Sequence, residues 1–172
     1  MKTIRLNLQP LTQSGFDRFG DVVETQGHSS EVINSGYATK YSNLAGIDTS
    51  EGNGKAAIHI FVAKKRQLPL KIDMLERHQF FSQCFIPRAK EAFLIVVAPP
   101  ADEPDIDKIK AFISDGEQGV NFARGVWHFP LISLDDGAQF ITIDRNYDPS
   151  VDTIEQCDIF EINNFDITLE IS

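Results

Sequence analysis

Residues 71–87 read KIDMLERHQFFSQCFIP, and this stretch carries the pattern on which the fold prediction rests. Successive side chains of a β-strand point to opposite faces, so the spacing places Ile72, Met74, Glu76 and His78 on one face of a predicted strand over 70–78. That face changes from apolar to ionisable along its length. If the sheet curls into a small barrel, the apolar end fills the floor and the Glu76/His78 end opens into a cavity.

The rest of the chain consists mostly of short apolar or alternating segments separated by Gly, Pro, Asn and Asp, which is typical of a sandwich or barrel. The sequence predicts further strands at 3–8, 21–24, 36–41, 56–63, 83–86, 93–98, 121–123, 131–134, 140–144, 154–162 and 165–171. One short helix is predicted at 12–19, where Thr12 can cap the first turn, and a second is predicted to begin at Asp105, with Ile106, Ile109, Phe112 and Ile113 at helical spacing. The segment APPADEP at 98–104 is predicted to be an exposed connection. We therefore expect an all-β chain with one or two short helices.

Length and composition indicate an ordinary globular protein. The chain has 172 residues, of which 42% are hydrophobic and 24% are charged, so residues 1–172 are predicted to form a single domain. The formal net charge of −9 opposes binding to nucleic acid or to an anionic membrane. The start MKTIRLNLQPL lacks the apolar run of a signal peptide, and no window is apolar enough for a membrane helix, so a cytoplasmic protein is expected. The widely spaced Cys84 and Cys157 are predicted to be buried free thiols.

Four polar side chains stand at a spacing that is informative about the site. Glu76, His78 and Gln83 read Glu-x-His-x4-Gln, and His128 ends the segment GVWH at 125–128. This resembles the cupin pattern His-x-His-x3-4-Glu followed by Gly-x-x-His, whose side chains converge on a metal inside a jelly-roll barrel. The resemblance implies a cupin-like β-barrel in which Glu76, His78, Gln83 and His128 take the four ligand positions, with Glu in place of the first His and Gln in place of the acid.

Longer blocks of sequence resemble one family within the cupins. They are LERHxxxxQxFIP at 75–87, PD at 104–105, AFI and GEQGVN within 111–121, RxVWHxPL at 124–131, and FxTIDR at 140–145. Five blocks in order at compatible spacing are more specific than any one of them, and together they resemble the ureidoglycolate lyase family. This resemblance implies cleavage of (S)-ureidoglycolate to glyoxylate and urea during allantoin and purine breakdown, by a homodimer.

The implied reaction requires a cation for the carboxylate, a base for the hydroxyl proton and an acid for the departing ureido nitrogen. Glu76, His78 and His128 are the candidate catalytic residues. The two histidines can act as base and acid or, when neutral, as ligands of a divalent metal, and Glu76 is a candidate base in either case. The four-residue set suits nickel, zinc, manganese or no metal, and the family resemblance favours nickel.

For the substrate carboxylate, an arginine fork offers two parallel hydrogen bonds that a lysine cannot reproduce. Arg124, which is close to His128 in the sequence, is the preferred residue, and Arg145 is the second. Arg77 is out of phase with Glu76, so it either binds substrate through a bulge or forms an ion pair on the other face of its strand. Trp127 either walls the pocket or anchors the core, and Gln83 either contacts the substrate or lies behind it.

Two other functions compete with the lyase assignment. One is an amidohydrolase that cuts the ureido group and releases ammonia. The other is a non-catalytic cupin that binds a small carboxylate such as glyoxylate.

Overall fold

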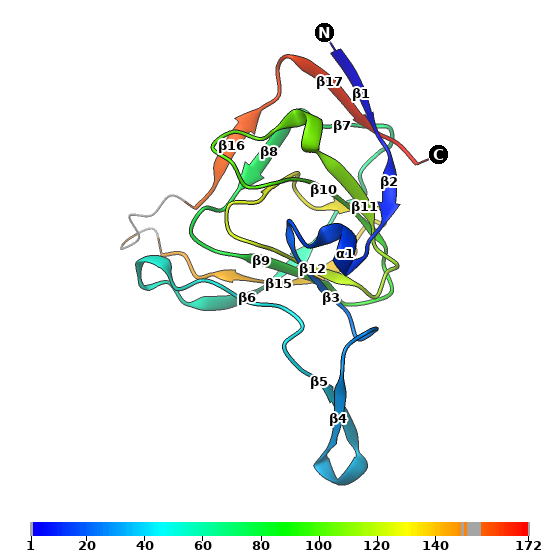
Figure 1. Cartoon of the computed structure of the whole chain (residues 1–172), viewed down its shortest axis with the longest axis vertical. Coiled ribbons are helices and arrows are strands. Elements are labelled where there is room, and N and C mark those ends of the chain that lie inside the picture. Colours follow the sequence, from blue (N-terminus) through cyan, green and yellow to red (C-terminus); the bar gives the residue numbers. More distant parts are fainter. Residues whose placement is uncertain (1, 149, 151–155, 172) are drawn as a thin grey trace.

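A computed structural model describes residues 2–148, 150 and 156–171, and its strands form three stacked sheets and one projecting hairpin (Figure 1). The middle sheet has the order β16 (Asp158–Glu161), β8 (Met74–Arg77), β13 (Trp127–His128), β10 (Phe93–Ala98), β11 (Lys110–Ile113) and β2 (Leu8–Pro10), with β14 (Ile132–Ser133) also paired to β10. A second sheet has the order β3 (Gly20–Val23), β12 (Gly119–Phe122), β9 (Gln83–Pro87), β15 (Gln139–Arg145) and β6 (Ala56–Val62). The third consists of β1 (Lys2–Leu6), β17 (Phe165–Leu169) and β7 (Leu70–Lys71).

The middle sheet is buried on both faces, and β10 shows why. The odd-numbered residues of Phe93–Ala98 pack into a core cluster between the middle and second sheets, while the even-numbered residues pack into another cluster against the third sheet. An uninterrupted apolar run is what a strand needs when both of its faces are covered. The catalytic candidate His128 lies on the side of the first cluster. Its ring stacks on Phe122, and Val126, two residues before it in the chain, belongs to the same cluster.

The all-β prediction is confirmed, and so is the first helix. Helix α1 (Gln13–Phe16) begins at Thr12, whose Oγ1 accepts a hydrogen bond from the backbone N–H of Gly15 at 3.2 Å. Its buried Phe16 packs against Phe112, with ring centroids 5.6 Å apart. The prediction of an exposed connection after β10 is also confirmed, since residues 100–103 are exposed.

The prediction of one continuous strand over 70–78 is wrong. Leu70–Lys71 forms β7 beside β17, and Met74–Arg77 forms β8 in the middle sheet. The backbone changes partners in between, because the N–H of Ile72 donates to Ile167 while the carbonyl of Asp73 accepts from Ile162. Ile72 and Met74 therefore pack in the cluster beside the third sheet and do not fill a barrel floor below Glu76.

The predicted second helix is also wrong beyond its first turn. Asp105 caps the 3-10 turn η3 (Ile106–Lys108) by accepting from the N–H of Asp107, but the chain then continues as β11. Residues 110–113 pair with β10 on one side, and 111–113 pair with β2 on the other. Tertiary pairing thus outweighs a helical spacing of four apolar residues.

The hairpin of β4 (Ser30–Ile33) and β5 (Ala38–Tyr41), joined by the 3-10 turn η1 (Asn34–Gly36), projects from the body of the molecule (Figure 1). Sequence reasoning did not predict β4. Another 3-10 turn, η2 (Glu51–Asn53), precedes β6. Of the strand predicted at 154–162, residues 154 and 155 lie outside the described part of the chain, and the described part contains β16. No helix in the described residues is both long enough and apolar enough to cross a membrane.

Candidate active site

Glu76, His78 and His128 meet between the middle and second sheets. Glu76 on β8 pairs directly with His128 on β13, and His78 follows immediately after β8. One ligand atom from each of the three side chains lies within 4.8 Å of the other two. Glu76 and His78 share a face because side chains two residues apart in an extended chain point the same way. His128 lies beside them because β13 pairs with β8.

The His128 ring is fixed on two sides. It is stacked on Phe122, with centroids 4.4 Å apart and planes inclined by 13°, and only 2% of the residue is exposed. Its Nδ1 lies 3.1 Å from the carbonyl oxygen of Val126, so the hydrogen-bond network assigns the proton to Nδ1. Its Nε2 faces Glu76 Oε1 at 3.5 Å.

The His78 ring is held in a similar way. Its Nδ1 lies 2.6 Å from the carbonyl oxygen of Gln156, and the ring stacks on Phe81 at 4.6 Å. Its Nε2 is buried and has no hydrogen-bond partner among the described residues. Burial, followed by the charge of His128, lowers the pKa of His78 below its ordinary value. His78 is therefore neutral at neutral pH.

Glu76 is ionised in this environment. Burial by itself raises the pKa of Glu76, but the adjacent His128 side chain and then the field of His78 outweigh it, and the net direction is downward. Its Oε2 lies 3.7 Å from Cys157 Sγ. Burial, and then the nearby Glu76 carboxylate, raise the pKa of the Cys157 thiol to about 12. Cys84 and Cys157 are both free, Cys84 buried and Cys157 half-buried.

The Nε2 atoms of His78 and His128, both buried and without a hydrogen-bond partner among the described residues, thus lie beside the Glu76 carboxylate. Buried polar atoms of this kind are normally satisfied, and nitrogen and carboxylate ligands in a cluster of this size suit a divalent transition metal. The residues present therefore fit a metal ion. The side-chain amide of Gln83 donates to Asp144 Oδ2 at 3.0 Å, which leaves its carbonyl oxygen available to a ligand.

Two adjoining cavities open onto this cluster. The larger has a volume of about 630 Å³ and is lined by residues that include Glu76 and the segment 64–66. The smaller has a volume of about 340 Å³ and is lined by residues that include His78, Asp144 and Arg145. Phe61 and Gln83 line both cavities. Glu76 therefore lines one cavity and His78 the other, and His128 is buried beside them.

Sequence reasoning missed three parts of this site. Asp144 accepts from Gln83 and also lies 3.0 Å from His59 Nε2 through its Oδ1. The position of Asp144 inside the block FxTIDR was the available signal. No local signal pointed to His59, because its side chain reaches Asp144 only through the pairing of β6 with β15. The cations at 64–66 stood outside every motif block.

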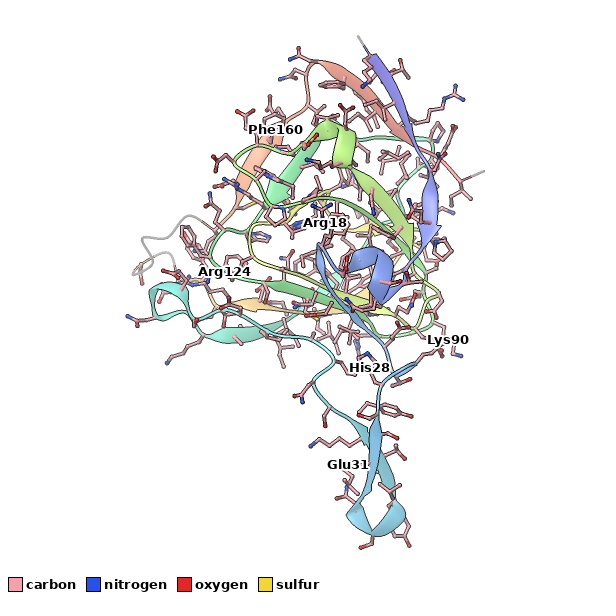
Figure 2. All side chains as sticks on the ribbon, viewed as in Figure 1. Arg18, His28, Glu31, Lys90, Arg124 and Phe160 are labelled. Carbon is pink, nitrogen blue, oxygen red and sulfur yellow. The ribbon has the colours of Figure 1, made fainter. Side chains whose placement is uncertain are left out.

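Several residues predicted to bind substrate are engaged elsewhere. Arg124 forms ion pairs with Asp48 at 3.2 Å and Glu51 at 3.3 Å, at the edge of the molecule that carries η2 (Figure 2). Arg77 pairs with Asp158 at 2.8 Å and lies 4.5 Å above the ring of Trp127.

Trp127 is 2% exposed, packs in the core against the third sheet, and donates from Nε1 to the carbonyl of Ala101 at 3.0 Å. Neither cavity has Arg77, Arg124 or Trp127 among its lining residues in the described part of the chain. Arg145 does line the smaller cavity, and its guanidinium reaches the carbonyls of Asn146 and Gly52 at 3.4 and 3.5 Å.

Comparison with known proteins gives consistent results. Residues 3–164 match the family model described as ureidoglycolate lyase. A ureidoglycolate lyase of Azotobacter vinelandii is 45% identical over 141 residues, which are 82% of this chain and 85% of that protein. One of Burkholderia mallei is 45% identical over 148 residues, covering 86% of this chain and 85% of that protein. Among solved structures, RmlC of Streptococcus suis matches with a TM-score of 0.44 at 12% identity, over 82% of this chain and 73% of that one.

Proposed function

Because this chain belongs to the ureidoglycolate lyase family, we propose that it cleaves (S)-ureidoglycolate to glyoxylate and urea, a carbon–nitrogen lyase reaction of allantoin and purine catabolism. The observation that carries the proposal is the cluster of Glu76, His78 and His128, in which Glu76 lines one cavity and His78 lines the cavity beside it. Histidine and carboxylate groups at one point supply the acid–base chemistry that the reaction needs.

The reaction moves one proton between two atoms bonded to the same carbon. The hydroxyl of ureidoglycolate loses its proton, the C–O bond becomes the aldehyde of glyoxylate, and the C–N bond breaks while the nitrogen gains a proton and leaves as urea. Glu76 accepts the hydroxyl proton because its lowered pKa keeps it ionised. Since the nitrogen lies on the same carbon, the protonated Glu76 can return the proton to it, so that urea leaves as a neutral molecule.

His78 supports this step as a neutral imidazole, and His128 lies beside the base, with its Nε2 3.5 Å from Glu76 Oε1. We propose that Glu76, His78 and His128, with the side-chain oxygen of Gln83 as the fourth ligand, hold a divalent metal, with nickel favoured over zinc and manganese. When bound, such an ion would act as a Lewis acid that lowers the pKa of the substrate hydroxyl. Elemental analysis of protein purified without chelator tests which metal is present.

Product analysis tests the reaction itself. Purified protein is mixed with racemic ureidoglycolate, and urea, ammonia and glyoxylate are measured together. The lyase predicts equal amounts of urea and glyoxylate, with half of the racemate consumed. Ammonia released in proportion to glyoxylate would instead establish the amidohydrolase, and tight glyoxylate binding without turnover would establish a non-catalytic binding protein.

We further propose that residues 1–172 form one domain that assembles as a homodimer in the cytoplasm. β6 is an edge strand, and it leaves Ile58 73% exposed and Val62 65% exposed. An exposed apolar edge strand favours pairing with a second copy. The two free thiols are in keeping with a reducing compartment. Light scattering coupled to size-exclusion chromatography tests the dimer, and a monomer at micromolar concentration would contradict it.

A further inference from the structure

Three consecutive cations, Lys64, Lys65 and Arg66, line the larger cavity together with Glu76. Within the described residues, none of the three forms an ion pair with a carboxylate, although the chain carries 25 Asp and Glu against 16 Lys and Arg. In a protein with this excess of acid, three neighbouring unpaired cations at a cavity form a local site for an anion.

The backbone of this segment is fixed while its side chains stay accessible. The N–H of Arg66 donates to the carbonyl of Ser133 at 3.0 Å, and Lys65 bridges to the same residue. The guanidinium of Arg66 lies 5.7 Å from the centroid of the Phe129 ring. The side chains of residues 64–66 are all exposed. The cations are thus anchored at one rim of the cavity without being neutralised.

The smaller cavity has a carboxylate, that of Asp144, on its wall. Asp144 accepts from Gln83 and lies 3.0 Å from His59 Nε2, and a carboxylate has about four acceptor positions, so it can accept further hydrogen bonds. Arg145 lies next to it in sequence, but its guanidinium nitrogens point to backbone carbonyls. The wall therefore offers an acceptor to a group that carries N–H donors.

We propose that ureidoglycolate lies across both cavities, with its carboxylate bound by Lys64, Lys65 and Arg66 and the NH₂ of its ureido group donating to Asp144. This inference rests on the proposed function and specifies how the same site recognises its substrate. Glu76 lines the carboxylate cavity, His78 lines the ureido cavity, and Gln83 lines both. The C–N bond that breaks then lies over the junction, and glyoxylate and urea are left in separate cavities.

The two products allow each end to be tested separately. Inhibition constants for glyoxylate and for urea are measured with the holoenzyme and with two variants, the triple variant Lys64→Gln/Lys65→Gln/Arg66→Gln and Asp144→Asn. Hydrogen bonds to charged groups contribute about 1.5–3 kcal/mol each, or about 10- to 150-fold in affinity. We expect the triple variant to raise the inhibition constant of glyoxylate at least 10-fold and to leave that of urea unchanged. Asp144→Asn should raise the inhibition constant of urea and leave that of glyoxylate unchanged.

Lys40→Gln is the matched control, because it removes one positive charge from β5 on the projecting hairpin and should change neither constant. An unchanged glyoxylate constant in the folded triple variant would overturn the inference. The inference would also be overturned if Arg145→Met weakened the binding of glyoxylate while the triple variant did not, because the substrate would then lie in the reverse direction. Glyoxylate binding can also be measured by calorimetric titration, which needs no turnover. The binding site is therefore tested separately from the lyase reaction, which is tested by product analysis.

Discussion

Replacing Glu76 by Gln removes the proposed general base while preserving the shape of the side chain. Oε1 of Glu76 lies 3.5 Å from His128 Nε2, and the side chain is 23% exposed. At an effective dielectric constant of about 20, the attraction between this carboxylate and a proton taken up by His128 would be worth at most about 5 kcal/mol, and the Gln variant would lose it. Loss of a general base typically lowers rates by about 10²- to 10⁴-fold, or about 3–5 kcal/mol. We therefore expect Glu76→Gln to lower kcat by two to four orders of magnitude.

The assay is steady-state release of glyoxylate and urea, with the fold of the variant checked by thermal unfolding. Glu161→Gln is the matched control, because it removes the same charge from β16, where Glu161 pairs with Met74 of β8 and faces solvent. It should leave kcat within about twofold, since surface changes of this kind rarely matter. A folded Glu76→Gln enzyme that keeps kcat within threefold of the wild type would refute the role of Glu76.

Three further predictions concern the metal, the thiols and acid stability. Removal of metal with a chelator should lower the melting temperature as well as activity, and nickel at 100 times its Kd should restore about 2.7 kcal/mol of stability; an unchanged melting temperature would argue against a resident metal. Burial raises the pKa of both Cys84 and Cys157 to about 12, so only about one thiol in ten thousand is a thiolate at pH 8, and rapid alkylation of the folded protein would contradict this. Asp158 has a pKa lowered below its ordinary value of 3.8, first by a hydrogen bond from Gln79 and also by Arg77. A lowered folded pKa stabilises the protein above the unfolded value, so Asp158→Asn should destabilise at pH 7, and the difference should disappear as pH falls below about 3.8 in acid unfolding.

Local geometry made part of the site predictable. Glu76 and His78 share a face because side chains two residues apart on a strand must do so. Thr12 caps α1 because a hydroxyl at that position reaches the free N–H groups of the first turn. Arg77 was predicted to be out of phase with Glu76, and it pairs with Asp158 and Trp127 in the structure.

The predictions that failed depended on which distant segment became the partner. Residues 106–113 have apolar spacing that fits a helix, but β10 and β2 flank them and hold them as a strand. The strand predicted at 70–78 divides because Ile72 and Asp73 bond to different neighbours. The substrate-binding role of Arg124, preferred for its closeness to His128 in sequence, stays a prediction; in the structure Arg124 forms ion pairs with Asp48 and Glu51.

The sequence by itself determined the all-β class, the family and the pair Glu76 and His78, because these depend on alternation along one strand and on ordered motifs. Only the tertiary structure decided that His128 lies opposite Glu76, that Gln83 turns its amide to Asp144, and that residues 64–66 line the same cavity. These contacts join residues far apart in the chain, and their register is set by the packing of whole sheets. No local pattern contains that information, which is why the substrate cations were sought among the arginines of the motifs, whereas the cations that line the larger cavity follow an edge strand outside every motif.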